Sequence, residues 1–417
     1  MEKLTFTIDG YSFSTAFNTA AKREQCAEKI LSTTGRHYSW YKENTGNKNW
    51  ILYDTEQYEV RNFDDIKYLV LNNRLMDVKT FLCVRRDFKG KLHLPINAST
   101  CSFMFVDSNV PEIDLTEFDT TNVVDMDYMF LEANLGDCLS LVSSTITQAN
   151  TPDRNILTLN TEGVISMSGM FKDCKVKHLD LRNLRTDNVT DFSDLFCSCN
   201  DLIDLNVDGF DTSKAKDFHG MFQGCIKLTQ LNVKHFNVDN VLHMSCLFSR
   251  CLRLKVINLE SWDFSQVSDA NEMFAYCEKL EKIIANFNFK MIKEMAFMFC
   301  YCTKLSKVDL SHSDLSHVFD FGYTFFKCEG LKDIRFSQGV WLKAKFTLSM
   351  FDDCKALERL NLPDVILDDV IRSYAMFDDC DSLKEIYMEH PLNLDKYERE
   401  LIFGNCKAEV KKSTEWQ

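Results

Sequence analysis

The stretch NVTDFSDLFCSCNDLIDLNV, residues 188–207, contains the pattern that decides the fold. Its first half spaces apolar residues by 3, 3, 1 and 3 positions, which is typical of one face of a helix. These residues are Val189, Phe192, Leu195, Phe196 and Cys199. Its second half, Leu205-Asn206-Val207, alternates apolar and polar residues, as a short half-buried strand does. The stretch therefore predicts a helix followed by a strand.

The same unit recurs along the chain every 25 or 26 residues, apart from one 41-residue step between Phe130 and Phe171. One phenylalanine marks each unit: Phe105, Phe130, Phe171, Phe196, Phe222, Phe248, Phe274, Phe299, Phe325, Phe351, Phe377 and Phe403. A cysteine follows three positions later in ten of them: Cys174, Cys199, Cys225, Cys251, Cys277, Cys302, Cys328, Cys354, Cys380 and Cys406. A fixed period of this length predicts a repeat solenoid in which neighbouring units bury each other's apolar faces.

We therefore expect an α/β repeat solenoid, a right-handed horseshoe of the leucine-rich-repeat type with a parallel sheet. The solenoid should occupy residues 91–417, with about twelve repeats and a polar C-terminal cap from residue 403. The repeat strands are expected at Leu205–Val207, Leu231–Val233, Ile257–Leu259, Val308–Leu310, Ile334–Phe336, Leu360–Leu362 and Ile386–Met388. The extra residues of the long step, 131–156, should form an inserted loop on one face of the solenoid.

Segments such as FDTTNVVDMDYMF (118–130), LRTDNVTDFSDLFCSC (184–199) and GFDTSKAKDFHGMFQGCIKLTQLNV (209–233) resemble a known repeat family. They are similar to the bacterial surface-protein 26-residue repeats, also called BspA-like leucine-rich repeats. The resemblance extends over about residues 100–405. It implies a non-enzymatic solenoid used for adhesion or protein binding, often on the surface of bacteria.

Residues 1–90 lack the repeat and are expected to form a small α/β domain that caps the first unit, with a helix within Phe13–Leu31. The aromatic residues between positions 37 and 53 of this domain are open to two interpretations. They are either the core of a small domain or an exposed binding patch.

Composition and charge restrict the class of function. The 417 residues carry a formal charge of −14, which disfavours direct binding to the phosphates of nucleic acids. No signal peptide and no apolar run long enough to span a membrane is recognisable, so we expect a cytoplasmic protein. The 17 cysteines are an odd number, and ten of them share one repeat position. We therefore expect free, buried thiols rather than a disulfide framework.

A search for chemistry yields no candidate active site. The sequence has no glycine-rich phosphate loop and no His-Glu-x-x-His pattern, and its nine histidines are scattered. Cys197-Ser198-Cys199 and Cys300-Tyr301-Cys302 bring thiols together, but the second cysteine of each belongs to the repeat. We predict no catalytic residues, no metal site and no cofactor, and leave open an enzyme within residues 1–95.

Function is then expected on the outward side chains of the strands, which vary between units while the inward ones do not. The candidate partner-binding residues are Asp204, Asn206, Asp208, Gln230, Asn232, Asn258, Glu260, Asp309, Arg335, Asn361 and Tyr387. The simpler interpretation is a solvated sheet face. The acidic charge favours a protein partner with a basic surface, so one hypothesis is an intracellular inhibitor that sequesters a basic, nucleic-acid-binding enzyme. The other is an adhesin-like surface protein, as the resemblance implies.

Overall fold

The computed structural model describes most of the chain from residue 99 onward and separate segments before it. The described residues are 4–8, 11–15, 20–34, 38–42, 50–54, 58–60, 82–84, 90–91, 99–115, 118–142, 155–337, 340–341, 344–362, 364–365, 373–389 and 394–416. The chain divides into two compact units, Met1–Val176 with Asn183–Asn188, and Lys177–Arg182 with Val189–Gln417. This division falls within the repeats, so the predicted domain boundary near residue 90 stays a prediction.

The described segments of the first ninety residues contain one helix and three antiparallel strand pairs. Their elements are β1 (Leu4–Ile8), β2 (Tyr11–Thr15), α1 (Ala20–Thr34), β3 (Tyr38–Lys42), β4 (Trp50–Asp54), β5 (Tyr58–Val60) and β6 (Leu82–Val84). Strand β1 pairs with β2, β3 with β4, and β5 with β6. The helix expected within residues 13–31 thus begins later, because residues 11–15 belong to a hairpin. His37 and the residues between β3 and β4 lie outside the described residues.

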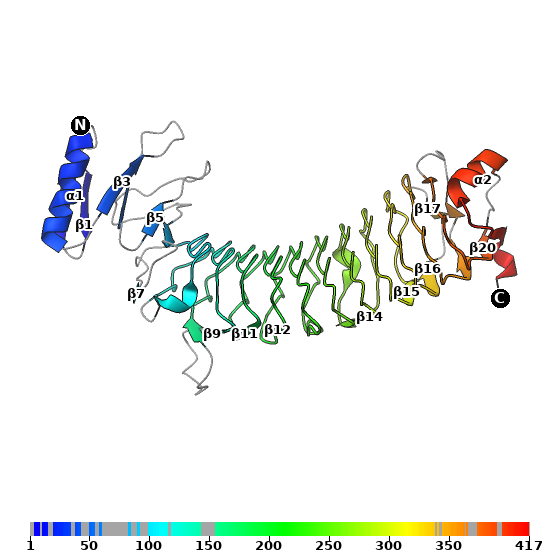
Figure 1. Ribbon diagram of the computed structural model, residues 1–417, viewed down its shortest axis with the longest axis horizontal. Coiled ribbons are helices and arrows are strands. Elements are labelled where there is room, and N and C mark those ends of the chain that lie inside the picture. Colours follow the sequence, from blue (N-terminus) through cyan, green and yellow to red (C-terminus); the bar gives the residue numbers. More distant parts are fainter. Residues whose placement is uncertain are drawn as a thin grey trace. The chain divides into compact units, whose positions relative to one another are not determined.

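From residue 99 the chain folds into stacked rungs, one rung for each repeat, and the predicted solenoid is confirmed (Figure 1). The strands of the rungs are β7 (Gly90–Lys91), β8 (Ile113–Asp114), β9 (Cys138–Val142), β10 (Asn155–Thr158), β11 (His178–Asn183), β12 (Asp204–Asn206), β13 (Val256–Leu259), β14 (Lys282–Ala285), β15 (Lys307–Leu310), β16 (Asp333–Phe336), β17 (Val340–Trp341), β18 (Arg359–Asn361), β19 (Asp364–Val365), β20 (Glu385–Met388) and β21 (Glu409–Lys412). The described pairs among these strands are parallel, for example β13 with β14 and β15 with β16. They form several short sheets rather than one continuous sheet, and residues 231–233 are not in a strand.

The predicted helix of each repeat is wrong for the described rungs. Its place is taken by a six-residue turn segment, such as residues 193–198, 219–224, 245–250 and 271–276. The second and sixth residues of each segment have a positive φ, for example 55° at Asp194 and 59° at Ser198. Backbone in this left-handed region cannot continue an α-helix.

Hydrogen bonds between rungs explain why the turns replace helices. The amides of Phe196 and Ser198 donate to the carbonyls of Met221 and Gln223 on the next rung, at 2.9 and 2.7 Å. The intervening amide of Cys197 donates within its own segment, to the carbonyl of Asp194 at 2.9 Å. Each backbone amide of residues 193–198 thus has a hydrogen-bond partner, and every second one donates to the next rung. The apolar spacing of 3, 3, 1 and 3 fits this turn as well as a helix, so sequence periodicity could not separate the two.

The ladder phenylalanines, at the fourth position of each turn segment, form the core of the stack. Adjacent rings from Phe196 to Phe377 have centroids 5.4 to 5.7 Å apart and are nearly parallel. These rings are almost completely buried, and so are the residues that precede them, such as Leu195, Met221 and Leu247. Burial of these aromatic rings at stacking distance contributes to the apolar stabilisation of each rung.

The last rung ends in a helix. Helix α2 (Lys396–Phe403) is capped at its N-terminus by Asp395. The carboxylate of Asp395 accepts a hydrogen bond from the backbone amide of Glu398 at 2.8 Å. The ring centroid of Phe403, the last residue of the helix, lies 5.1 Å from that of Phe377, so that Phe403 ends the phenylalanine ladder. The polar cap predicted from residue 403 is therefore preceded by a short helix that takes the position of a turn segment. None of the described helices has both the length and the apolar composition needed to cross a membrane.

The inserted segment at residues 131–156 contains regular structure at its ends. Strand β9 lies within it, and β10 begins near its end and pairs with β9 in parallel register, Leu157 opposite Leu141. Residues 143–154 lie outside the described residues. The prediction of a plain inserted loop is therefore incomplete, since part of the insertion adds a strand.

Candidate functional site

The outward residues of the strands and the turns that follow them form the strand-side surface, and this surface includes the residues predicted from sequence. Parallel, in-register pairing places equivalent positions of adjacent rungs next to each other, as at His178 and Asp204. Asp204, Asp208, Gln230, Asn232, Glu260 and Arg335 are exposed, while Asn206, Asn258, Asp309 and Asn361 are partly buried. Ten of the eleven predicted residues therefore reach the solvent to some extent.

Charged side chains of the strand side pair with their neighbours on the next rung. Lys234 Nζ lies 2.8 Å from Glu260 Oε2, and this contact lowers the pKa of Glu260. His178 Nδ1 lies 2.6 Å from Asp204 Oδ2, and Lys307 Nζ lies 2.9 Å from Asp333 Oδ2. The amide of Asn232 donates to Asp208 Oδ1 at 2.8 Å. The acidic character predicted for this surface is thus partly neutralised within the protein itself.

Three of the predicted residues also have a local structural role. The side-chain oxygens of Asn206 and Asn258 accept hydrogen bonds from the backbone two residues later, at Asp208 and Glu260, each at 3.0 Å. Asp309 accepts equivalent bonds from the amide and hydroxyl of Ser311, at 3.0 and 2.6 Å. Such bonds stabilise the turn that follows a strand. The recurrent asparagine at this position therefore closes turns, and its recurrence by itself is not a sign of partner binding.

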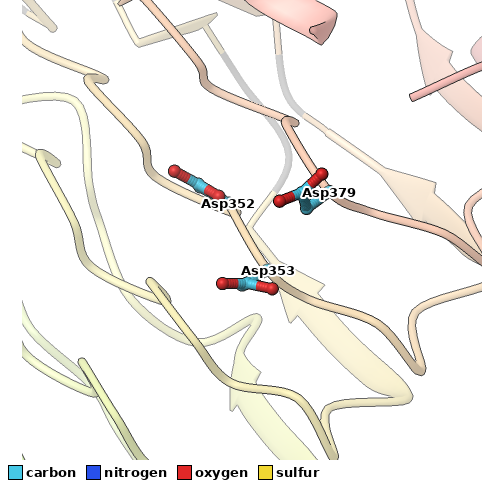
Figure 2. Close-up of side chains that lie close together, drawn as sticks. All are labelled: Asp352, Asp353 and Asp379. Atoms are coloured by element: carbon cyan, nitrogen blue, oxygen red, sulfur yellow. The ribbon is translucent and has the colours of Figure 1, made fainter. Parts of the chain in front are cut away.

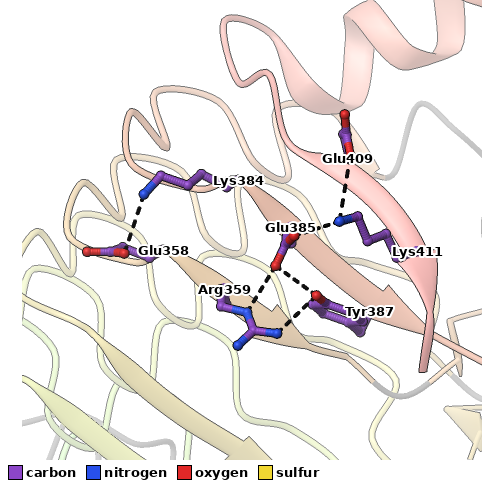
Figure 3. A network of polar contacts seen from close by, with 7 residues as sticks. All are labelled: Glu358, Arg359, Lys384, Glu385, Tyr387, Glu409 and Lys411. Atoms are coloured by element: carbon purple, nitrogen blue, oxygen red, sulfur yellow. Dashed lines mark hydrogen bonds and ion pairs between the residues drawn. The ribbon is translucent and has the colours of Figure 1, made fainter. Parts of the chain in front are cut away.

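Tyr387 was predicted to face solvent, and this prediction is wrong: only 3% of the residue is exposed. Its ring packs against Trp416, with centroids 5.0 Å apart, and Arg359 lies over both rings. The C-terminal segment supplies Trp416 and covers the position, which the repeat pattern could not indicate. The hydroxyl of Tyr387 donates to Glu385 Oε2 at 2.7 Å and accepts from Arg359 at 3.0 Å (Figure 3).

Glu385 is the centre of this C-terminal network. Lys411 donates to its carboxylate at 2.6 Å and Arg359 at 3.0 Å, from the rungs on either side (Figure 3). The bonds from Lys411 and Tyr387 lower the pKa of Glu385 to about 2. This part of the strand side is therefore held in a fixed arrangement by ionic contacts between three neighbouring strands, β18, β20 and β21.

A second surface was missed in the sequence. The second, fifth and sixth residues of the turn segments form the turn-side surface, and between residues 250 and 327 it carries five partly exposed aromatic rings. These are Tyr276, Phe297, Tyr301, Tyr323 and Phe326. Tyr276 stacks on Tyr301 at 4.9 Å, and Phe297 on Tyr323 at 4.7 Å. The signal was available: these residues recur two positions before or one or two positions after a ladder phenylalanine.

Three carboxylates lie together on the same side, on the next two rungs. Asp352, Asp353 and Asp379 place carboxylate oxygens within 4.8 Å of one another (Figure 2). Burial, together with the charges of Asp378, Asp353 and Asp379, raises the pKa of Asp352 to about 6. Lys355 and Lys327 lie 2.9 and 3.0 Å from Asp353 and supply counter-charges. Because the cluster has these ammonium partners, its geometry alone does not identify a metal site.

The cysteine column has a structural contact in nearly every described rung. The thiols of Cys251, Cys277 and Cys328 donate to the carbonyls of Phe222, Phe248 and Phe299 at 3.1 to 3.2 Å. Burial raises the pKa of Cys277 to about 12 and also raises the pKa of Cys328 well above its ordinary value. None of the cysteines whose side chains the structure describes forms a disulfide, as predicted. The thiols of Cys277 and Cys328 are poor nucleophiles because burial disfavours the thiolate form.

Comparison with known proteins identifies the repeat region. The profile of a family described as "Mycoplasma protein of unknown function, DUF285" matches residues 96–139, 140–230, 165–280, 248–359 and 275–390. No curated protein matches the chain. Among solved structures, a leucine rich cell surface protein from Faecalibacterium prausnitzii A2-165 is similar, with 13% sequence identity and a TM-score of 0.24. The similarity covers 66% of this chain and 88% of that one, but a TM-score this low supports no conclusion on shared function.

Proposed function

The chain belongs to the DUF285 family, whose profile matches lie within residues 96–390, and we propose that it is a non-enzymatic protein-binding solenoid. The family description assigns no function, so the proposal depends on the surface of the rungs. One observation carries it: the residues that point inward repeat from rung to rung, while most of those that point outward differ between rungs.

The contrast is visible on three neighbouring rungs. Their ladder residues Phe222, Phe248 and Phe274 are identical and completely buried. The last residues of the same turn segments are Gly224, Arg250 and Tyr276. A periodic scaffold with an aperiodic exterior offers a wide surface on which a particular partner can be recognised.

The absence of enzymatic activity is part of the proposal. Thiols of the cysteine column such as Cys277 and Cys328 donate hydrogen bonds to backbone carbonyls and have raised pKa values. His219 is partly buried, and its Nδ1 lies 2.7 Å from the hydroxyl of Ser245. These arrangements support a structural role for both residue types.

The finer form of the proposal concerns the partner and the compartment. A net charge of −14 favours partners with a basic surface, in agreement with an intracellular protein that sequesters a basic enzyme. Since strand-side charges pair with each other, this attraction would come from the whole chain more than from Asp204, Asp208 and Glu260. The alternative, an adhesin-like surface protein, is supported by the resemblance of the repeats to BspA-like sequences.

Affinity capture from the host with the intact chain tests the proposal. We expect a partner to be retained by the native chain and lost after Asp208→Lys together with Glu260→Lys, because both side chains are exposed on the strand side and the reversals repel a basic partner. The matched control is Asp239→Lys with Glu278→Lys, two exposed positions outside the strands. Retention of the same partner by both variants, or of none by the native chain, would contradict the proposal for this surface.

Protease treatment of intact host cells distinguishes the two compartments. A cytoplasmic chain should remain intact until the cells are lysed, whereas a surface chain should be cleaved before lysis. Alkylation of native protein cannot replace this measurement, because the ladder thiols are buried in either compartment.

A further inference from the structure

The sixth residues of six consecutive turn segments form one column on the turn side, here named the sixth-position column. Its members are Arg250, Tyr276, Tyr301, Lys327, Asp353 and Asp379. The column begins with a cation, continues through two aromatic rings and a lysine, and ends with two carboxylates. Its charge is therefore polarised along the stack of rungs, although the repeat itself imposes no polarity on exposed residues.

The members of the column contact each other in sequence. The guanidinium of Arg250 lies 5.0 Å from the ring centre of Tyr276, and Tyr276 stacks on Tyr301 at 4.9 Å. Lys327 lies 5.7 Å from the ring centre of Tyr301 and 3.0 Å from the carboxylate of Asp353. The ring faces are thus covered by neighbours, so flat stacking on a sugar or a nucleobase is blocked. Contacts with a partner must use ring edges, hydroxyls and the charges at the two ends.

Both ends of the column are exposed. Arg250 has no carboxylate within ion-pair distance among the described residues, and the preceding rung has Gly224 at the equivalent position. At the other end Asp379 is exposed and accepts a hydrogen bond from the side-chain amide of Asn405 at 3.1 Å. Asp379 is also one of the carboxylates that crowd Asp352 (Figure 2). An additional cation at this end would relieve their repulsion.

We propose that the turn side binds a second copy of this chain, in an antiparallel arrangement about a twofold axis between the rungs of Tyr301 and Lys327. In this register Arg250 of each copy faces Asp379 of the other, and Tyr301 faces Lys327. The column is self-complementary only when reversed. A parallel arrangement would place Arg250 against Arg250 and Asp379 against Asp379, with like charges opposed.

The size of the contact indicates its strength. Five steps between adjacent rungs, each of about 5 Å, give a contact of about 25 Å along the solenoid, which corresponds to a small interface. We therefore expect a reversible dimer with a dissociation constant in the micromolar range or weaker. This inference goes beyond the proposed function, because recognition of another protein on the strand side does not require it.

Sedimentation velocity of the full chain over about 1 to 200 μM tests the inference, with that range chosen to bracket weak association. The native chain should show a concentration-dependent monomer–dimer equilibrium. Arg250→Asp and Asp379→Arg should each weaken it about tenfold or more, since each places like charges opposite one another. An equimolar mixture of the two variants should dimerise again, because both ion pairs of the heterodimer are then attractive.

Rescue by mixing is the decisive result, since a residue that merely supports the fold of its own chain could not produce it. The strand-side reversal Lys234→Glu serves as the control and should leave the equilibrium unchanged. Thermal unfolding of each variant checks that it folds. If either charge reversal prevents folding, the milder substitutions Arg250→Gln and Asp379→Asn are used in its place. The proposal would be overturned if the native chain stayed monomeric over the whole concentration range. It would also be overturned if the mixture of the two variants dimerised no more strongly than each variant alone.

Discussion

The strand side and the turn side of the same rungs arrange their exposed residues in different ways. On the strand side, Lys234 pairs with Glu260 and Lys307 with Asp333, so that opposite charges alternate between rungs. On the turn side, Tyr276 and Tyr301 stack, Lys327 pairs with Asp353, and Arg250 and Asp379 place opposite charges at the two ends of the column. In-register stacking places each outward residue beside the same position of the next rung. The order of residues within a column therefore decides whether a surface is neutralised or polarised.

The interior of the rungs should be far more sensitive to substitution than either surface. Phe248→Ala removes a completely buried ring from the ladder and should lower the free energy of unfolding by about 3–5 kcal/mol. Tyr301→Ala removes a partly exposed ring of the turn side and should cost about 1 kcal/mol. Chemical denaturation of the full chain measures both. Similar losses for the two variants would show that the turn-side rings are part of the core.

Acidification should weaken the strand side near the C-terminus. Folding lowers the pKa of Glu385 to about 2, from an ordinary value of 4.5. Its stabilising contribution is therefore present above about pH 4.5 and is lost as the pH falls toward 2. Glu385→Gln should lower the thermal midpoint at pH 7, and the difference from the native chain should shrink by pH 3. A difference that is the same at both pH values would mean that hydrogen bonding without charge accounts for the contact.

The acidic end of the turn side should become less stable as the pH rises, which is the opposite of the behaviour expected at Glu385. Folding raises the pKa of Asp352 to about 6, from an ordinary value of 3.8. The native state thus favours the protonated carboxyl, and the chain loses stability as the pH rises through about 6. Asp352→Asn should stabilise the protein by about 1 kcal/mol at pH 8, after allowance for screening, and have little effect at pH 4. Thermal unfolding at the two pH values measures it, and Asp239→Asn is the exposed control.

The smallest effect is expected at Ser249, the fifth residue of the turn segment 245–250. Its hydroxyl is buried and, among the described residues, has no hydrogen-bond partner. Ser249→Ala should therefore stabilise the protein by a few tenths of a kcal/mol to about 1 kcal/mol. Ser245→Ala provides the comparison, because the hydroxyl of Ser245 contacts His219 at 2.7 Å. Destabilisation by Ser249→Ala would indicate a bound water or another partner at this hydroxyl.

The sequence was sufficient to predict the rungs, the buried phenylalanine ladder and the free thiols. It was not sufficient to predict a turn segment in place of a helix at residues 193–198. The reason is that both place Phe192, Leu195, Phe196 and Cys199 on one side. The choice depends on whether amides bond within the segment or to the next rung, and this is a contact between residues about 25 positions apart.

The candidate surfaces show the same division. Exposure of Asp204 and Glu260 followed from strand alternation, whereas the burial of Tyr387 depended on Trp416 from the C-terminal segment. The turn-side stack of Arg250, Tyr276, Tyr301 and Lys327 could have been found by aligning the repeats on their ladder phenylalanine. That these four side chains contact one another required knowledge of the turn geometry.

The repeat of apolar residues determined that this chain forms a solenoid, because a single unit cannot bury its own apolar side and neighbouring units can. Only the tertiary structure decided which exposed residues become neighbours and which are neutralised. That outcome depends on the register between rungs, on the left-handed turn residues and on the C-terminal cap, all of which arise from contacts distant in sequence.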